Sequence, residues 1–309
     1  MAMENKTAVS YFVLSGVSSD PQLQPFIFLV FLLIYLLTVL GNGTIMMVIT
    51  YEPHLHSPMY FFLTHLSFID ICYSIVTVPK MLQNLLADKK TISFDGCLVQ
   101  MSLILLVSGT EISMLSAMAY DQYAAICAPL HYLRTMNKQV HIRLVGGTWL
   151  ISIFHALTNT VPVLHLHFCG PNEIDNFSCE LPSVLELSCT ETFICKMTLL
   201  TSVLGLTAFS ITLVSYICII STILKIPSAE GGGKAFSTCS SHLTVVVLYY
   251  GAALFRYLRP NSASSVILDR LFSIQYSILT PMLNPIIYSL RNKEVKVALG
   301  NILQKMKGL

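Results

Sequence analysis

Residues 26–50 read FIFLVFLLIYLLTVLGNGTIMMVIT, an apolar run without a single charged residue. A helix needs about 20 apolar residues to cross the roughly 30 Å hydrocarbon core of a bilayer, so this segment is long enough to span a membrane. Further runs of similar length follow, each bounded by charge, proline or glycine. The seven predicted spans are Phe26–Thr50, Met59–Leu82, Leu98–Cys127, Val140–Leu164, Lys196–Leu224, Phe236–Tyr257 and Leu268–Leu290.

The composition of the whole chain agrees with this prediction. Of its 309 residues 54% are hydrophobic and 11% are charged, whereas soluble proteins are about 25% charged. The net charge of only +2 and the mean hydropathy of +0.68 exclude a disordered chain and a nucleic-acid binder. A membrane β-barrel is disfavoured because the apolar runs are continuous rather than alternating. We therefore predict an all-α membrane protein, a seven-transmembrane helix bundle.

This bundle, residues 26–290, is preceded by a mostly polar tail, residues 1–25, and followed by residues 291–309. In the last segment Val295, Leu299, Ile302, Leu303 and Met306 recur at helical spacing between lysines. Such a pattern predicts a short amphipathic helix that lies on the inner leaflet and contacts membrane lipid.

The orientation of the chain follows from charges and sequons. Seven spans place the termini on opposite faces, and Lys and Arg slightly favour the face of the C-terminus, which the positive-inside rule makes cytoplasmic. Asn5-Lys6-Thr7 and Asn176-Phe177-Ser178 are N-glycosylation sequons, and both fall on the opposite face. We therefore predict an extracellular N-terminus, a cytoplasmic C-terminus and glycans at Asn5 and Asn176.

Four of the nine cysteines fall in predicted outer loops or at an outer helix end: Cys97, Cys169, Cys179 and Cys189. An even group on an oxidising face predicts two disulfide bridges, although the sequence alone allows three pairings. Cys195, at the outer end of the fifth span, could compete for a bridge.

Two carboxylates, Asp70 and Glu111, lie in the middle of predicted spans with no basic residue at similar depth. Charge at that depth costs several kcal/mol unless it is paired or hydrated. With Asn42 and Asn284 at comparable depth, two interpretations stay open: a hydrogen-bonded packing network, or a sodium or proton site that biases conformation. Pro281 and Pro285 predict a kink or hinge in the last span.

No motif of an enzyme is present. The chain lacks the His-Glu-x-x-His and Gly-x-Ser-x-Gly patterns of metalloproteases and serine hydrolases. Gly231–Gly233 and Lys234 do not form a phosphate-binding loop, since Ala235 stands where Ser or Thr is required; we expect a flexible inner loop there. His165 and His167 are interpreted as surface residues, with weak metal binding as the alternative.

Several motifs in order along the chain resemble one family. They are PMYFFL at 58–63, MAYD at 118–121, SY at 215–216, KAFSTCSSHL at 234–243 and PMLNPIIYSLRN at 281–292. From about Leu14 to Leu299 the chain resembles the vertebrate olfactory receptors, a branch of the rhodopsin-like G-protein-coupled receptors. The short tail and the 234–243 motif resemble the tetrapod, or class II, group.

This resemblance implies a plasma-membrane odorant receptor that activates a stimulatory, olfactory-type G protein and raises cAMP. It implies the bridges Cys97–Cys179 and Cys169–Cys189, and a sodium ion held by Asp70 and Glu111 in the inactive state. A small volatile odorant would bind in the outer half of the bundle, where Ile104 offers no acid to anchor an amine. The implied ligand-binding residues are Ile104, Leu105, Ser108, Ile112, Leu200, Thr201, Leu204, Leu254, Tyr257, Ile274 and Ser277.

The residues implied in switching and G-protein coupling are Asp121, Gln122, Tyr123, Tyr216, Tyr250, Asn284, Pro285 and Tyr288. Gln122 departs from the family, which nearly always has arginine after this aspartate. Glutamine keeps hydrogen bonding but loses the charge, so the Asp121 pairing must be rebuilt or lost. A receptor of the same fold with impaired or altered coupling is therefore the first alternative function. A transporter is a weaker one, since neither inverted repeats nor a continuous polar path is present.

Overall fold

The structure, a computed structural model, describes residues 10–17, 20–169, 171–189, 191–258, 265–291 and 293–307. Side chains are described throughout these ranges except at residues 133, 191–202, 229, 234, 238, 253–258, 265–267, 290–291, 293 and 302–307.

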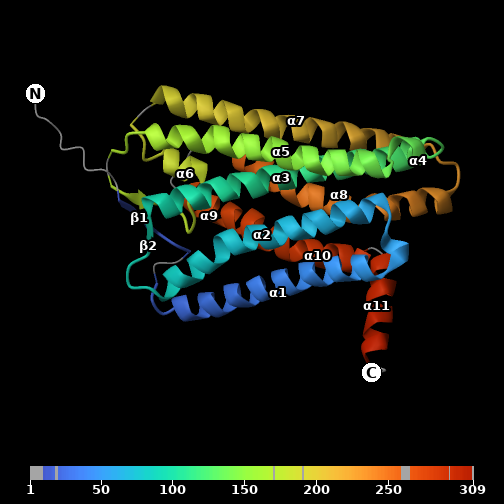
Figure 1. The fold of residues 1–309 in the computed structure, drawn as a ribbon, viewed down its shortest axis with the longest axis horizontal. Coiled ribbons are helices and arrows are strands. Elements are labelled where there is room, and N and C mark those ends of the chain that lie inside the picture. Colours follow the sequence, from blue (N-terminus) through green and yellow to red (C-terminus); the bar gives the residue numbers. More distant parts are fainter. Residues whose placement is uncertain are drawn as a thin grey trace, which may run out of the picture.

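The described chain is a bundle of long helices that run side by side (Figure 1). The outer-end loops and the strands β1 and β2 lie at one end of the bundle, and α4 and α11 lie at the other. In order, the elements are β1 Tyr11–Leu14, α1 Gln24–Tyr51, η1 Pro53–Leu55, α2 Pro58–Leu86, β2 Thr91–Ser93, α3 Phe94–Cys127, α4 Tyr132–Thr135, α5 Lys138–Thr160, η2 Val161–His165, β3 Glu173–Ile174, α6 Leu181–Leu185, α7 Glu191–Leu224, α8 Ala229–Leu258, α9 Ser265–Ile274, η3 Gln275–Leu279, α10 Thr280–Arg291 and α11 Lys293–Lys307.

The predicted seven-helix membrane fold is confirmed. Within the described residues five helical segments are long and apolar enough to cross a membrane: Gln24–Tyr51, Pro58–Leu86, Phe94–Cys127, Lys138–His165 and Val203–Leu224. Helix α8 and the continuous run α9–η3–α10 complete the seven. Helices are the expected form, because every backbone N–H and C=O must find its partner inside the segment when no water is available.

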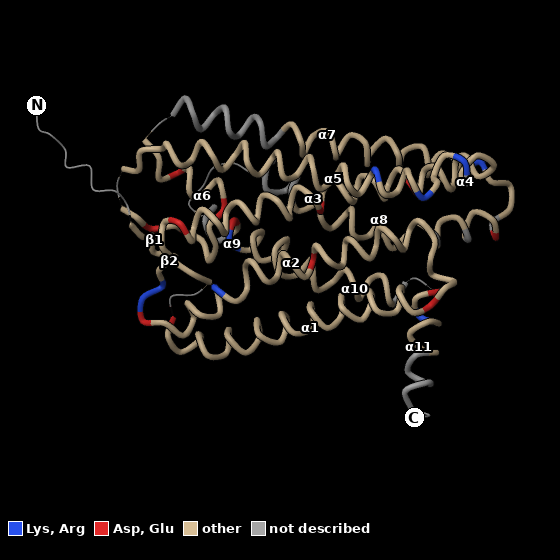
Figure 2. Tube along the Cα trace, in the orientation of Figure 1, with Lys and Arg blue, Asp and Glu red and all other residues tan. Residues whose placement is uncertain are grey.

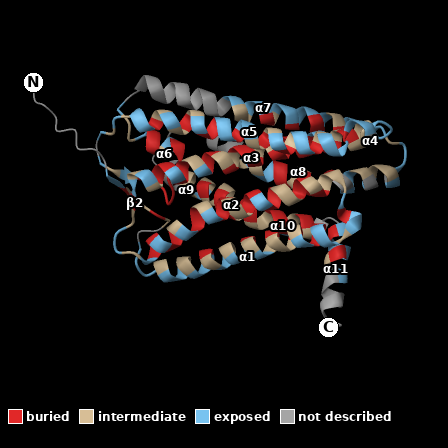
Figure 3. Ribbon diagram, in the orientation of Figure 1, coloured by how far each residue is buried: buried red, intermediate tan, exposed pale blue. Residues whose placement is uncertain are grey.

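Burial follows the membrane pattern rather than that of a soluble protein. Figure 3 shows buried residues on the sides of the helices that face one another and exposed residues on the outward sides. Among the outward residues are large apolar ones, such as Leu150 at 69% and Phe154 at 68% exposed. In the described part of the chain Lys and Arg gather at the two ends of the bundle, whereas acidic positions also occur in its middle (Figure 2).

The expectation of a flexible loop at Gly231–Gly233 was wrong, because these glycines form the first turns of α8. Ser228 precedes the helix, and its Oγ accepts a hydrogen bond from Gly231 N at 3.1 Å. A serine in this position is a strong helix start signal, and Glu230 complements the positive end of the helix dipole. These end effects offset part of the cost of about 1 kcal/mol that each of these glycines adds inside a helix.

The seventh span is irregular just before the prolines that predict a kink. One turn of π-helix, η3, separates α9 from α10, and Thr280 N donates to Gln275 O five residues earlier. Pro285 has no N–H, so the carbonyl of Pro281 loses its partner within the helix. Asn42 Nδ2 on α1 supplies that partner at 2.9 Å.

The helix α1 contacts α10 closely at this point. A Cβ added to Gly41 would lie 3.1 Å from Pro285 Cγ, so only glycine fits without displacing the proline ring. The kink, the asparagine and the glycine therefore form one packed unit between the first and last spans.

The outer end carries a small sheet that the sequence did not predict. Its strand order is β2-β1-β3, with β1 antiparallel to β2, where Phe12 pairs with Ile92, and parallel to β3, where Val13 pairs with Glu173. Phe12, Ile92 and Ile174 enter one apolar cluster with the outer end of α3. Part of the predicted tail is thus an ordered cover on the bundle.

Candidate functional site: a polar column and its two ends

A polar site lies in the middle of the bundle where α2, α3 and α10 face one another. Asp70 is 1% exposed and Asn284 is 2% exposed. Asn284 Nδ2 donates to both carboxylate oxygens of Asp70, at 3.2 Å and 2.9 Å. The asparagine next to the proline kink is therefore tied directly to the buried aspartate of α2.

Glu111 is the least satisfied charged group of the described residues. It is 0% exposed, neither carboxylate oxygen has a hydrogen-bond partner, and it lies close enough to Asp70 for the two carboxylates to interact electrostatically. A buried uncompensated carboxylate is strongly destabilising. The site therefore calls for a cation, a proton or water between these groups.

Within the described residues, four more buried side-chain oxygens on α1, α2 and α10 have no hydrogen-bond partner. They belong to Asn42, Tyr73, Asn284 and Tyr288. Hard cations prefer such oxygen donors. Among the described residues no group of three or more His, Cys, Asp and Glu side chains is placed to hold a metal ion, so a cation here would depend on amide and hydroxyl oxygens as well as on the two carboxylates.

At the inner end, Asp121 pairs with a loop tyrosine. Asp121 is 2% exposed, and its Oδ1 accepts a hydrogen bond from Tyr132 Oη on α4 at 2.9 Å. His141 Nε2 on α5 lies 4.0 Å from the same oxygen. Burial and the negative charge of Asp121 raise the pKa of Tyr132, which keeps its hydroxyl protonated and able to donate.

The hydrogen bond from Tyr132 shows how Asp121 is paired in a chain that has Gln122 in place of the family's arginine. Gln122 is 3% exposed, and its Oε1 has no hydrogen-bond partner among the described residues. The pairing of Asp121 is thus rebuilt with Tyr132, and Gln122 does not take the place of the absent arginine in that pair.

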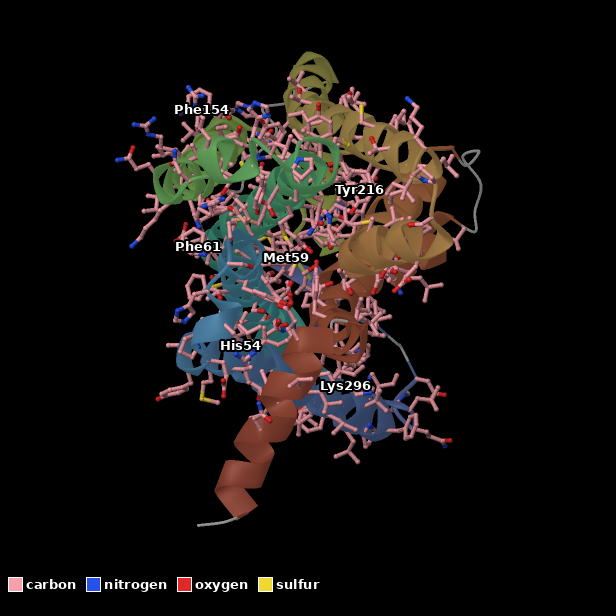
Figure 4. The ribbon with its side chains drawn as sticks, turned by 90° about the vertical axis from the view of Figure 1, so that its right-hand side faces the viewer. His54, Met59, Phe61, Phe154, Tyr216 and Lys296 are labelled. Atoms are coloured by element: carbon pink, nitrogen blue, oxygen red, sulfur yellow. A yellow bond between two sulfur atoms is a disulfide. The ribbon has the colours of Figure 1, made fainter. Side chains whose placement is uncertain are left out.

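Two of the implied switch residues lie where α7 meets α8. Tyr216 Oη and His242 Nδ1 are 2.7 Å apart and share a hydrogen bond; Figure 4 shows Tyr216 between these helices. Tyr250 packs on Phe209 with ring centroids 5.1 Å apart. Tyr288 is buried on α10. Among the described residues the hydroxyl of Tyr288 has no hydrogen-bond partner, so Tyr216 and Tyr288 share no hydrogen bond, and the hydroxyl of Tyr216 is bonded to His242 instead.

At the outer end, the implied disulfides are both present. Cys97 at the start of α3 is joined to Cys179, with Cα atoms 5.4 Å apart. Cys169 is joined to Cys189, with Cα atoms 5.8 Å apart. The side chain of Cys195 lies outside the described residues.

Glu180, which follows the disulfide cysteine Cys179, is a buried polar residue at the outer end that the sequence did not predict. Glu180 is 4% exposed; it accepts hydrogen bonds from Tyr276 Oη on η3 and, at 3.3 Å, from Ser178 Oγ. Gln100 Oε1 on α3 accepts from Cys179 N at 3.0 Å. The disulfide between Cys97 and Cys179 could have pointed to Glu180, because it holds the loop residues next to Cys179 at the outer end of the bundle.

The described members of the implied ligand-binding set enter different apolar clusters. Ile104 packs in the central cluster with Tyr73 and Tyr276, and Ile112 in the cluster of Tyr216 and Tyr250. Other members lie elsewhere: Leu105 packs against α5 and the outer loop, and Ile274 against α1 and α2.

The two serines of the set bond within their own helices, Ser108 to Leu105 O at 3.4 Å and Ser277 to Ser273 O at 2.5 Å. Leu204 on α7 is partly buried and Tyr123 on α3 partly exposed. The side chains of Leu200, Thr201, Leu254 and Tyr257 lie outside the described residues, so their roles stay predictions.

The prediction of a glycan at Asn176 does not fit the folded chain. Asn176 is 3% exposed, and its Nδ2, the atom to which a glycan would be attached, donates to Ser273 Oγ at 3.1 Å. The sequon is present, but the loop turns its asparagine into the bundle, which the sequence pattern alone does not reveal. Asn5 lies outside the described residues, and its glycan stays a prediction.

Comparison with known proteins agrees with this arrangement. A sequence model described as "Olfactory receptor" matches residues 31–306. Olfactory receptor 8S1 of Homo sapiens is 49% identical over 96% of this chain and 82% of its own length. Olfactory receptor 2K2 of Homo sapiens is 48% identical over 99% of this chain and 97% of its own. Olfactory receptor 4E2 of Mus musculus is 44% identical over 99% of each chain.

The chain is a membrane bundle of seven helices, with an outer loop joined to α3 by a disulfide and with buried polar residues in its middle. This is the architecture of a rhodopsin-like receptor, not of an enzyme. Within that class, the chain belongs to the olfactory receptor family. The predicted family, fold class and multi-pass membrane character are confirmed.

Proposed function

We propose that this odorant receptor binds a small volatile ligand in the outer half of the bundle and activates a stimulatory, olfactory-type G protein at its inner end. The match to the olfactory receptor family over residues 31–306 carries this proposal. Receptors work because an agonist binds one arrangement of the helices more tightly than another, without chemistry.

The location of the ligand is supported by the character of the outer end. There Ile104 and Leu105 are buried, and Ser108 is partly buried. Apolar side chains with a few hydroxyls suit a ligand held by burial and one or two hydrogen bonds. Glu180 and Tyr276 add a buried acceptor and a hydroxyl to this end.

The proposed coupling end contains Asp121, Gln122 and Tyr123, with the C-terminus in the cytoplasm and the N-terminus outside. A specific observation favours a second candidate, a receptor whose coupling is weaker: Gln122 is buried, and its Oε1 has no hydrogen-bond partner among the described residues. Arginine at this position would restore a cation next to Asp121.

A sodium ion between Asp70 and Glu111 is proposed for the inactive state. The orphaned oxygens of Glu111, Asn42 and Asn284 support it, because the ion would neutralise charge that burial otherwise disfavours. A melting temperature of the purified receptor that rises in sodium chloride but not in choline chloride, and that loses this response in Asp70→Asn, would support the site. An equal response to both salts would count against it.

The function is tested by expressing the chain with a cAMP reporter and applying a broad panel of volatile compounds. We expect at least one compound to raise cAMP in cells that display the receptor, and a larger rise at equal surface display with Gln122→Arg. A response of Gln122→Arg equal to that of the wild type would refute the role given to this residue. No response of either to any compound would refute coupling to this G protein.

A further inference from the structure

A groove opens at the inner end of the bundle between the start of α2 and the start of α5. It has a volume of about 430 Å³, and its lining includes His56, Ser57, Phe61, Lys138, His141 and Ile142. None of the residues lining it is acidic. Figure 4 looks at this end and shows Phe61 on the flank of the bundle, on the same side as Phe154 of α5.

We propose that this groove binds the phosphate-bearing headgroup of an anionic phospholipid from the cytoplasmic leaflet. The leaflet assignment rests on the orientation proposed above, whereas the binding chemistry does not. The proposal goes beyond odorant binding and G-protein coupling, since neither involves this flank.

The first support is the direction of two helices. Both α2 and α5 begin at the groove, at Pro58 and Lys138. The helix dipole places partial positive charge at each of these ends, which attracts an anion. The charge of the dipole carries this support rather than free N–H groups, because Pro58 has no N–H and Asn137 Oδ1 already accepts a hydrogen bond from Val140 N of α5 at 3.1 Å. The Ser57 side chain makes no capping hydrogen bond to α2, which leaves its hydroxyl available to a ligand.

The second support is the set of basic and unpartnered side chains. Lys138 is exposed at the rim, and no ion pair of its ammonium occurs within the described residues. His141 is 5% exposed and lines the groove, and its Nε2 lies 4.0 Å from Asp121 Oδ1. A lining with one lysine, two histidines and no acidic residue favours an anionic occupant.

The third support distinguishes a lipid from a free anion. On α5, Ile142, Gly146, Leu150 and Phe154 follow one another at intervals of four residues and therefore form one stripe along the helix. Three of them are large apolar side chains exposed by 53%, 69% and 68%, and a Cβ at Gly146 would meet nothing within 4 Å. The stripe begins at the groove, so a headgroup bound there has a path for its acyl chain.

The headgroup would lie one side chain away from the coupling site. His141 both lines the groove and approaches Asp121 to 4.0 Å. Its ring also packs edge-on against Phe62, with centroids 5.5 Å apart. Occupation of the groove would therefore fix the histidine that faces the Asp121–Tyr132 pair.

Native mass spectrometry of the full-length receptor with equal amounts of phosphatidylserine and phosphatidylcholine tests the proposal. We expect the wild type to retain phosphatidylserine in preference to phosphatidylcholine. Lys138→Gln should weaken the binding of phosphatidylserine about fivefold, as expected for the loss of one lysine near an anionic lipid. The matched control is Lys225→Gln, which removes the same charge from the exposed inner end of α7 and should leave the preference unchanged.

Ser57→Asp is a second test variant, chosen because it should keep the receptor folded while it abolishes the preference for phosphatidylserine. Aspartate is a preferred first residue before a helix, so the melting temperature in phosphatidylcholine should hold or rise, while the added carboxylate repels phosphate and removes the preference. Equal retention of the two lipids by the wild type, or equal losses in Lys138→Gln and Lys225→Gln, would overturn the proposal.

Inorganic phosphate without lipid is the last arm of the experiment. We expect it to leave the melting temperature unchanged at concentrations where phosphatidylserine raises it. An equal rise would mean that the groove takes a free anion and that the lipid assignment is wrong. No arm uses an odorant or a G protein, so failure here is distinct from failure of the proposed function.

Discussion

The two ends of the bundle are held together by different kinds of bond. At the outer end two disulfides and a three-stranded sheet tie the tail, the loops and α3 into one cover. At the inner end the described links are single hydrogen bonds between side chains: Tyr132 to Asp121, Tyr60 to Glu294 at 2.8 Å, and Tyr216 with His242.

This difference suits a receptor that must present a constant surface to its ligand and a changeable one to its partner. A disulfide is not broken by ligand binding, whereas a single hydrogen bond contributes about 0.5–1.5 kcal/mol and can be exchanged. The region between them, with the π-turn η3 before α10 and the unsatisfied Glu111, is where the two ends would be coupled.

The largest effect is expected from removing the disulfide that joins α3 to the outer loop. Cys97→Ser breaks the bond between α3 and the outer loop, and loss of a native disulfide costs about 2–5 kcal/mol. We expect most of the protein to fail to reach the cell surface, measured by antibody labelling of intact cells. Cys218→Ser, which changes a cysteine without a disulfide on α7, is the control. If both variants reach the surface equally, the covalent cover is not what holds the outer end.

A smaller loss is expected from the inner end with Tyr132→Phe, which removes the hydrogen bond to Asp121. Hydrogen bonds to charged groups are worth about 1.5–3 kcal/mol, so the apparent melting temperature of the purified receptor should fall. The control Tyr120→Phe changes an exposed tyrosine of α3 and should change little. Equal melting temperatures for the two variants would contradict the pairing.

The same variant has a defined pH dependence. Burial and Asp121 raise the pKa of Tyr132 above the ordinary tyrosine value of about 10. A folded-state pKa above that of the unfolded chain gives stability that is complete below about pH 10 and is lost above it. The difference between wild type and Tyr132→Phe should therefore be constant from about pH 7.5 to 9. A difference that disappears within this range would exclude a neutral tyrosine as the donor.

The contact that joins the first and last spans is tested with two glycines of α1. Gly41→Ala places a Cβ 3.1 Å from Pro285 Cγ, whereas a Cβ at Gly43 meets nothing within 4 Å. Both variants gain about 1 kcal/mol of helix propensity, and only the first adds an overpacking cost of about 1–3 kcal/mol. Gly43→Ala should melt at or above the wild-type temperature and Gly41→Ala below Gly43→Ala. The reverse order would show that α10 does not press on α1 there.

Features that depend on local composition or on a short motif could be predicted from the sequence. The spans, Asp70 with Asn284, and the family's disulfides could be predicted, because bilayer thickness and cysteine chemistry act through composition and motif. The spans were drawn too short at several ends: α3, for example, begins at Phe94 rather than Leu98. Ser93 fixes this earlier start, ahead of the apolar run, since its Oγ caps α3 by accepting from Gly96 N.

What could not be predicted depends on contacts between distant segments. The sheet of Tyr11–Leu14 needs partners at Thr91–Ser93 and Glu173–Ile174, and the pair of Asp121 with Tyr132 needs the loop to turn back on the helix. Leu105 and Ile274 share helical stripes with other implied ligand residues, yet the rotation of each helix directs them to different clusters. Periodicity gives the faces of a helix but not the neighbour that each face meets.

The smallest effect is expected in the outer loop. It tests whether the sequon at Asn176 is glycosylated although its asparagine is buried. Asn176→Gln should leave the mass of the glycosylated receptor on a denaturing gel unchanged, because Asn176 Nδ2 is committed to Ser273 inside the fold. Asn5→Gln should lower that mass to the value found after enzymatic removal of glycans. The loss of the hydrogen bond to Ser273 should cost Asn176→Gln about 1 kcal/mol of stability, seen as a slightly lower melting temperature. A mass shift with Asn176→Gln would mean that a glycan is attached before the loop folds, and the outer cover would then have to close around a different side chain.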